Sequence, residues 1–254
     1  MTQSTNSAPK PRALTTADLK ESLKRGIADF AAAPMVDLFF ASFFVLTGMV
    51  MFWITYATGT TFWLVLAVMG FPLVGTLAAL GFYETSRLRM AGEPVDFNAI
   101  RRMVWSHKNG QLPWLATIIV VIFLFWFFLG HMIFALFLGL APMTNIHSSL
   151  DVFLTADGLM MLTFGSVVGA LFAIVIFALS VLGIPMLYDR DIDFMTAIIR
   201  SMGAVRANPV IYLAWGFFLA IVTLAAMLPL FLGLFIAMPV LGHATWHLYK
   251  RVTE

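Results

Sequence analysis

The chain has 254 residues, of which 61% are hydrophobic and 11% carry a charged side chain, and its net charge is only +2. A soluble domain carries about 25% charged residues, so this composition excludes an ordinary soluble protein. The lack of cysteine excludes disulfides, thiolate metal sites and a cysteine nucleophile. We expect an all-α protein embedded in the lipid bilayer, with no nucleic-acid partner, because the basic residues lie between apolar runs.

The apolar runs define a short tail and a polytopic helical bundle. Residues 1–12 are polar and small, which indicates a disordered cytoplasmic tail, and residues 13–254 form a single membrane domain. A helix needs about 20 apolar residues to cross a bilayer. Six runs meet this length and predict transmembrane helices near residues 36–56, 61–83, 114–140, 158–187, 210–228 and 230–249. Only Met227–Leu230 separates the last two runs, which suits two helices joined by a tight turn.

All 15 Lys and Arg residues fall on one side of these expected spans. They occupy the N-terminal segment, the second and fourth connections between spans, and the C-terminus. Cationic segments are retained in the cytoplasm during membrane insertion. We therefore expect a multi-pass protein of the bacterial inner membrane with both termini in the cytoplasm.

The cationic segments also indicate a threefold internal repeat. Each segment has an amphipathic helical pattern and leads to a proline just before a span, at Pro34, Pro113 and Pro209. We expect three hairpins in a parallel repeat, each preceded by an amphipathic cytoplasmic helix. The expected repeat units are about 14–88, 94–188 and 192–250.

Helix-capping residues begin the three amphipathic segments. Thr15 with Asp18 resembles a capping box, and Asp96 and Asp193 are candidate N-caps. The apolar face of the first helix is expected to comprise Leu19, Leu23, Ile27 and Phe30. This face predicts a helix that lies on an anionic leaflet, packs on the end of the bundle, or does both.

Three histidines are candidates for chemistry, because ionisable residues within spans are often functional. His243 and His247 lie four residues apart on one face of the last span, where they could bind a metal ion or haem. We favour interhelical hydrogen bonding or anchoring at the interface. His131 lies alone in the third span, and a lone histidine is more often a bundle residue than a ligand.

Other patterns are less specific. Met143 and His147 could bind copper in the outer loop, although chance pairs are expected among 16 methionines. Glu84 and Arg87 have the spacing of an ion pair at a helix end. A third pattern, GxxxG, predicts close helix packing in the fourth span, at Gly165 and Gly169.

The sequence contains no familiar catalytic motif, and we expect no enzymatic activity and no cofactor. Asp37 begins the first span and is expected to face the bundle. The lack of carboxylates at the middle of the expected spans counts against an ion-coupled transporter. A transporter or channel for a small or amphiphilic solute would instead need a polar cavity, with candidate lining residues Thr47, Thr76, Thr163, Ser166, Ser180 and Thr223.

Three strings carry a resemblance to a known family. They are AALGFYETSR at 78–87, GIPMLYDRDID at 183–193 and PVLGHATWHLY at 239–249. The chain resembles a family of bacterial integral membrane proteins of unknown function, over most of its length from about residue 30 and most strongly in the last string. Some members of that family are labelled as cytochrome c oxidase subunits.

The resemblance implies a link to respiration but not a catalytic oxidase subunit. Such a subunit would resemble a twelve-span core with six metal-binding histidines, whereas this chain has five histidines. We therefore expect a non-enzymatic accessory or assembly subunit of a respiratory complex such as cytochrome c oxidase. The alternatives are a transporter or channel, and a protein that handles haem or copper through His243, His247 and His131.

Overall fold

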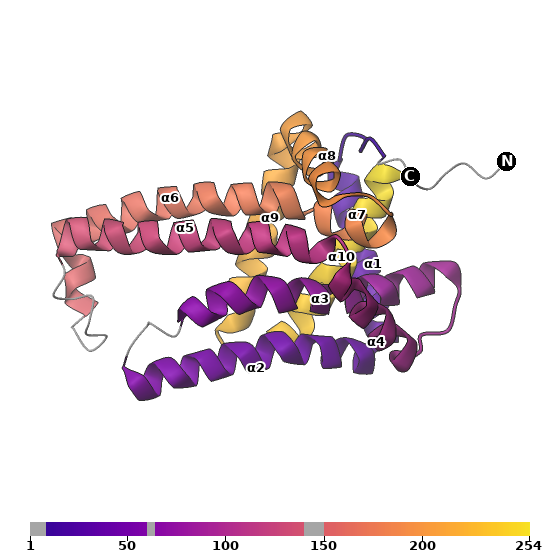
Figure 1. Cartoon of the computed structure of the whole chain (residues 1–254), viewed down its shortest axis with the longest axis horizontal. Coiled ribbons are helices and arrows are strands. Elements are labelled where there is room, and N and C mark those ends of the chain that lie inside the picture. Colours follow the sequence, from indigo (N-terminus) through magenta and orange to yellow (C-terminus); the bar gives the residue numbers. More distant parts are fainter. Residues whose placement is uncertain (1–8, 60–63, 140–149) are drawn as a thin grey trace.

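The computed structural model describes residues 9–59, 64–139 and 150–254, and in these ranges the chain is all-α. Figure 1 labels the helices in chain order. Their bounds are α1 Thr16–Ala32, α2 Pro34–Thr58, α3 Leu64–Ala91, α4 Phe97–Ser106, α5 Leu112–Leu138, α6 Ala156–Ser180, α7 Gly183–Asp189, α8 Phe194–Ala207, α9 Pro209–Met227 and α10 Leu234–Thr253. Two short 3-10 helices, His107–Asn109 and Leu150–Leu154, accompany them.

The helices begin where local chemistry predicts. The Thr15 side chain accepts a hydrogen bond from the Asp18 backbone N–H, and the Asp18 carboxylate accepts one from the Thr15 backbone N–H, which confirms the capping box of α1. Asp96 and Asp193 are confirmed as the N-caps of α4 and α8. Proline occupies the first or second position of the long helices that follow, where its missing N–H costs least, at Pro34, Pro113 and Pro209.

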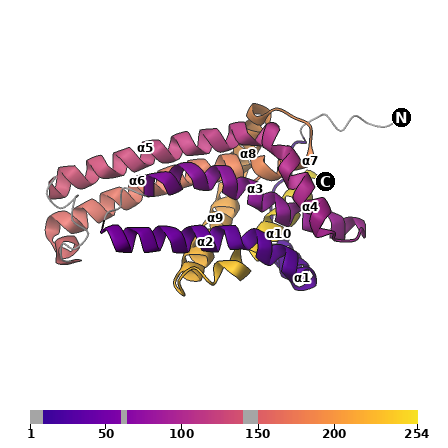
Figure 2. The same ribbon diagram turned by 60° about the horizontal axis from the view of Figure 1, so that its bottom comes forward.

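The long helices α2, α3, α5 and α6 run along the longest axis of the molecule (Figures 1 and 2). The shorter helices α1, α4, α7 and α8 gather at one end with the C-terminal part of α10. The buried core lies at this end and contains large side chains such as Phe82, Tyr212 and Trp246. Away from it, α2, α5 and α6 expose apolar side chains, including Trp53, Phe125 and Leu136.

Four of the described helices are long and apolar enough to cross a membrane: Pro34–Thr58, Leu112–Leu138, Ala156–Asp189, which joins α6 to α7, and Pro209–Met227. They coincide with four of the six expected spans. Their exposed apolar surface is suited to contact with lipid, since a bilayer solvates hydrocarbon as well as a protein core does.

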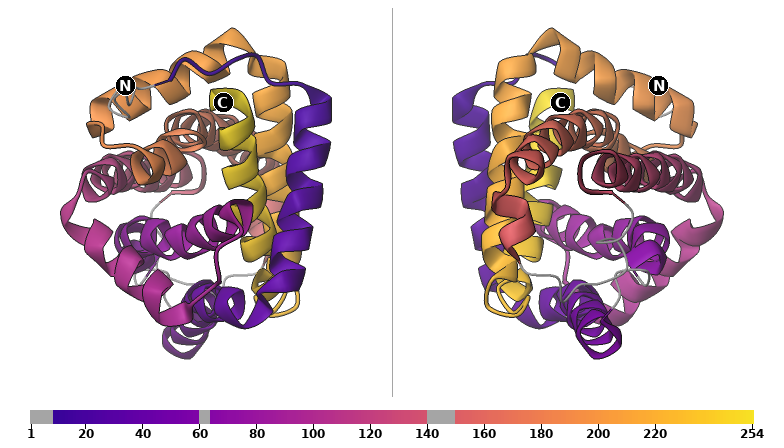
Figure 3. Two further views of the ribbon diagram at one scale, coloured as in Figure 1. Left: turned by 90° about the vertical axis from the view of Figure 1, so that its right-hand side faces the viewer. Right: turned by 90° about the vertical axis from the view of Figure 1, so that its left-hand side faces the viewer.

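The expected parallel set of three hairpins is not shown by the structure. Helix α9 runs across the α5–α6 pair rather than along it (Figures 1 and 3). The ring of Phe231, in the turn before α10, packs against Gly48 in the middle of α2. Because α2 continues for ten residues beyond Gly48, this turn stops about 15 Å short of the end of α2.

Helix α10 behaves as a core helix rather than as a lipid-facing span. It packs against α1, α2, α3, α7 and α9, and most of its residues from 241 to 249 are buried. The expected break before it is confirmed, since α9 ends at Met227. Leu230 and Phe231 then adopt positive φ angles of 51° and 66° to reverse the chain.

Helix α1 packs along α10 (Figure 3), and its buried face is not the apolar one. The buried residues are small or acidic: Asp18, Ser22, Gly26 and Asp29. A Cβ atom at Gly26 would lie 2.6 Å from the Val240 carbonyl oxygen, so only glycine permits this close approach. On the expected apolar face, Leu19 and Leu23 are half-buried and Ile27 is exposed.

Candidate functional site

Six polar side chains from four helices form a continuous hydrogen-bonded network at the packed end of the molecule. We call it the carboxylate–histidine cluster, and it comprises Asp29 of α1, Asp37 of α2, Ser86 and Arg89 of α3, and His243 and His247 of α10. Five of these residues are buried, and only the Arg89 side chain reaches the surface.

Local geometry explains how each helix contributes. His243 and His247 lie one turn apart on α10 and therefore project from the same face. Ser86 and Arg89 are three residues apart on α3, so they also share a face. Asp29 and Asp37 lie on either side of the break between α1 and α2, where Pro34 begins a new helix direction.

His243 is the centre of the inner half of the cluster. Its Nε2 atom lies 2.9 Å from Asp37 Oδ2, and its Nδ1 atom lies 2.8 Å from Ser86 Oγ. Neither His243 nor Asp37 has any exposed side-chain surface. The Phe82 ring packs edge-on against the imidazole at a centroid distance of 5.7 Å, which holds the ring orientation.

Asp29 is the centre of the outer half. Its Oδ2 atom accepts a hydrogen bond from Ser86 Oγ at 2.6 Å and lies 2.7 Å from His247 Nε2. Its Oδ1 atom accepts from Arg89 Nε at 2.7 Å. Burial opposes ionisation of Asp29, but the hydrogen bonds from His247, Ser86 and Arg89 outweigh it and lower the pKa to about 2.

The hydrogen-bond directions restrict where protons can lie. The Ser86 hydroxyl donates its only proton to Asp29, so its oxygen accepts from His243 Nδ1–H. The remaining contact, between His243 Nε2 and Asp37, then requires one shared proton, held either by the imidazole or by the carboxyl group. The pair is neutral overall in both forms. Asp37 Oδ1 is buried and has no hydrogen-bond partner in the described part of the chain.

Two further polar groups tie α3, α7 and α10 together. Arg87 donates to both carboxylate oxygens of Glu84, at 2.6 and 3.0 Å, which confirms the expected ion pair. Tyr188 donates to Glu84 from α7. Beside it, Tyr249 of α10 donates to Asp189 at 2.8 Å. These contacts hold α7 against α3 and α10 at the packed end.

Residues 64–189, from the start of α3 to the end of α7, match a family described as predicted integral membrane protein (DUF2189). The chain belongs to this family. Membership makes it a multi-pass integral membrane protein, in agreement with its long apolar helices. No curated protein and no solved structure matches the chain.

The match to this family covers only part of the cluster. Ser86 and Arg89 lie within the matched residues, together with the first expected string and most of the second. The four residues Asp29, Asp37, His243 and His247 lie outside the match. So does the C-terminal string 239–249, where the sequence had led us to expect the strongest resemblance.

The remaining candidate residues do not join the cluster. His131 Nδ1 lies 2.7 Å from the Phe127 carbonyl oxygen of its own helix. Met143 and His147 lie outside the described residues. Gly169 faces α5, where an added Cβ would lie 3.2 Å from Trp126 Nε1, and at Gly165 it would make ordinary contact with α5.

The cluster is better suited to holding protons than to holding a metal ion or haem. Among the residues that the structure describes, no three His, Asp or Glu side chains are arranged to hold a metal. Both ring nitrogens of His243 are engaged, so a metal bound there would break its hydrogen bond to Asp37 or to Ser86. The sequence favoured interhelical hydrogen bonding or anchoring at the interface for both histidines, and the structure shows the interhelical hydrogen bonds.

Sequence reasoning missed Asp29, Ser86 and Arg89. Asp29 lies 218 residues from His247, and Ser86 lies 157 residues from His243, so no local spacing connects them. One signal was present in the sequence. Asp29 interrupts the apolar and basic pattern of α1 on the same face as Asp18, Ser22 and Gly26, a face too small and polar to contact lipid.

Proposed function

We propose that this chain is a non-enzymatic protein of the bacterial inner membrane that binds a protein partner within the bilayer, with both termini in the cytoplasm. All six apolar runs would enter the membrane as three hairpins from the cytoplasmic side. In this proposal the third hairpin, α9–α10, turns back beside the middle of α2. The retention of cationic segments in the cytoplasm supports this orientation.

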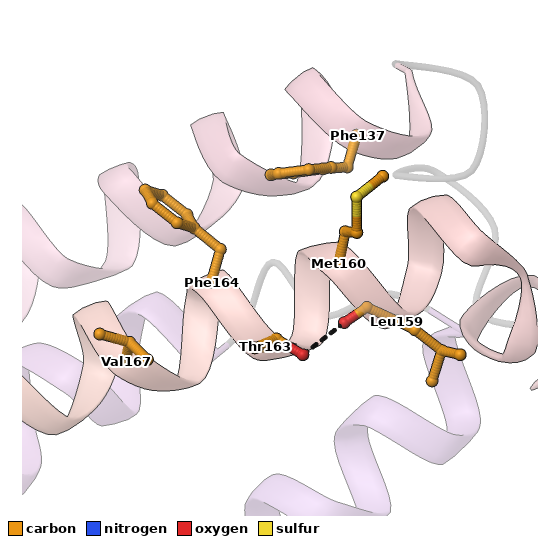
Figure 4. Close-up of a pocket in the computed structure, with 6 residues that line it drawn as sticks. All are labelled: Phe137, Leu159, Met160, Thr163, Phe164 and Val167. Carbon is orange, nitrogen blue, oxygen red and sulfur yellow. Dashed lines mark hydrogen bonds between the residues drawn. The ribbon is translucent and has the colours of Figure 1, made fainter.

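One observation carries the partner-binding proposal: α5 and α6 extend beyond the packed core and form an aromatic groove (Figure 4). The groove has a volume of about 490 Å³ and is lined by Phe137, Leu159, Met160, Thr163, Phe164 and Val167. The rings of Phe137 and Phe164 lie 6.2 Å apart. Aromatic side chains and methionine are enriched at protein interfaces, and helices associate in membranes through close packing.

The polar groups of the cluster support a structural rather than a catalytic role, because most of them are paired with one another and all except Arg89 are buried. The Thr163 hydroxyl in the groove likewise donates to the Leu159 carbonyl of its own helix, at 2.8 Å (Figure 4). Ser166, another residue expected to line a polar cavity, is exposed on α6.

The test is to purify a tagged copy from its native host in mild detergent and to identify co-purified proteins by mass spectrometry. Met160→Trp fills the groove, and Leu162→Trp adds the same side chain to the exposed opposite face of α6. We expect partner capture to fall at least several-fold with Met160→Trp and to be unchanged with Leu162→Trp. Equal capture by both variants would overturn the groove as the partner site.

The narrower proposal is that the partner belongs to a respiratory complex such as cytochrome c oxidase. It rests on the oxidase labels that some members of the family carry. Co-purification of oxidase subunits, absent from an untagged control, would support it. A deletion strain with normal oxidase content and oxygen consumption would remove this part of the proposal and leave partner binding itself open to the test above.

A transport role coupled to protons is the second candidate, and the unpartnered Asp37 Oδ1 beside His243 favours it. A carboxyl–imidazole pair that shares one proton could release it when the helices move. Proteoliposomes with a trapped pH dye test this idea. Asp37→Asn should abolish any proton flux. The control Asp191→Asn, at an exposed position, should leave the flux unchanged. Wild-type proteoliposomes as proton-tight as empty ones would exclude it.

A further inference from the structure

A second groove lies between α1 and α9 at the packed end of the molecule. It has a volume of about 240 Å³ and is lined by Leu19, Lys20, Leu23, Ala214, Trp215 and Phe218. This is less than the roughly 300–1,000 Å³ of a pocket that encloses a drug-sized ligand. The groove is open to the surface, and it is large enough for a segment of a hydrocarbon chain.

The groove combines an apolar wall with a free cation. Lys20 is exposed and has no ion-pair partner among the residues that the structure describes. Two other cations near α1 are engaged: Arg25 pairs with Glu21 at 2.9 Å, and Arg12 pairs with Asp18 at 2.8 Å. Lys20 is therefore available for an anion at the rim of the groove.

The orientation of α1 leaves the apolar side chains of this groove open to the surface. Its small and acidic face is buried against α10, so Leu19 and Leu23 remain only half-buried and Ile27 is 52% exposed. Apolar side chains beside lysines are the pattern of a helix at the membrane interface, with ammonium groups at the level of the lipid phosphates.

Trp215 supplies a second, independent feature. It lies six residues after the start of α9, is 2% exposed and stacks on Phe218 at a centroid distance of 5.4 Å. Its indole Nε1 has no hydrogen-bond partner within the described ranges. Buried tryptophans normally satisfy this donor, and tryptophan is enriched at the level of the lipid headgroups.

We propose that the α1–α9 groove binds an anionic phospholipid. Part of one acyl chain lies between Leu23 and Phe218, and the phosphate lies at Lys20. Partner binding by the α5–α6 groove is not required. The proposed cytoplasmic orientation of the packed end decides only which leaflet supplies the lipid. It would be the cytoplasmic leaflet, which is rich in anionic lipids.

The test uses the full chain in detergent and native mass spectrometry with added phosphatidylglycerol or phosphatidylcholine of the same acyl chains. We expect phosphatidylglycerol to be retained more strongly. Lys20→Gln should weaken its retention about five-fold, because one lysine contributes about 1 kcal/mol of attraction at an anionic surface. Arg101→Gln removes one charge from an exposed position on α4 and should have no effect.

Ala214→Trp fills the groove from its exposed side and should reduce the retention of both lipids. Three outcomes would overturn the proposal: equal loss with Lys20→Gln and Arg101→Gln, equal retention of the two lipids, or displacement by millimolar inorganic phosphate. Lipid retention is measured on the purified chain, so it does not depend on partner capture from cells. Failure of either experiment would therefore not affect the conclusion drawn from the other.

Discussion

His243 Nε2 lies 2.9 Å from Asp37 Oδ2, and neither side chain has exposed surface. The two residues are 206 positions apart, on α10 and α2. Their contact holds the C-terminal helix against the first long helix. Because the remaining Asp37 oxygen is buried without a partner, His243 is the main neighbour able to stabilise a charge on this carboxyl group.

Replacing His243 should therefore destabilise the protein strongly. His243→Ala leaves Asp37 buried and unpaired, and we expect a cost of about 3–5 kcal/mol. His131→Ala is the matched control and should cost much less, since that imidazole is half-exposed and contacts its own helix. Thermal unfolding in detergent measures both. The double variant Asp37→Asn/His243→Ala tests their coupling. If its loss of unfolding free energy equals the sum of the losses of the two single variants, the two residues are not coupled.

Acid should weaken the fold through Asp29. Its pKa is lowered to about 2, below the ordinary value of about 4. The ionised form thus stabilises the fold above about pH 4, and this contribution, about 2 kcal/mol, is lost as the pH falls from about 4 to 2. Asp29→Asn should be less stable than wild type at pH 6, and the difference should shrink over this window.

The control for Asp29 is Asp191→Asn, at an exposed position. Its difference in melting temperature from wild type should stay nearly constant between pH 6 and pH 2.5. A constant difference for Asp29→Asn as well would show that Asp29 has an ordinary pKa in the folded protein.

The close contact between α1 and α10 depends on Gly26. An alanine Cβ there would lie 2.6 Å from the Val240 carbonyl oxygen, and the two helices would have to separate. We expect Gly26→Ala to destabilise by about 1–3 kcal/mol. Gly203→Ala, on the exposed side of α8, meets no atom within 4 Å and should stabilise by up to about 1 kcal/mol. Unfolding curves that rank the two variants the other way would contradict the packing of α1.

Tyr188 contributes a hydrogen bond to the buried carboxylate of Glu84. Tyr188→Phe keeps the ring but removes the donor, and we expect a loss of about 1.5–3 kcal/mol, typical of a hydrogen bond to a charged group. Tyr56→Phe is the control, since Tyr56 is 80% exposed on α2. Indistinguishable melting temperatures for the two variants would show that the α3–α7 contact contributes little.

The position of α10 shows what sequence patterns do not predict. The run 230–249 has the length of a span, and length predicts that it crosses the bilayer like the others. In the structure, His243 and His247 have carboxylate partners on α1 and α2, which place α10 inside the bundle. Periodicity and length describe a helix, but they do not identify what surrounds it.

The sequence by itself determined the membrane class, the bounds of most helices and their caps, because these depend on composition and on residues within one or two turns of each other. It also indicated that Asp37 faces the bundle, and for the two C-terminal histidines it favoured interhelical hydrogen bonding or anchoring at the interface. Only the tertiary structure decided that α1 buries its acidic face, that Asp29 joins His247, and that α10 lies in the core. The physical reason is that these contacts join residues up to 218 positions apart, and the packing of whole helices selects them.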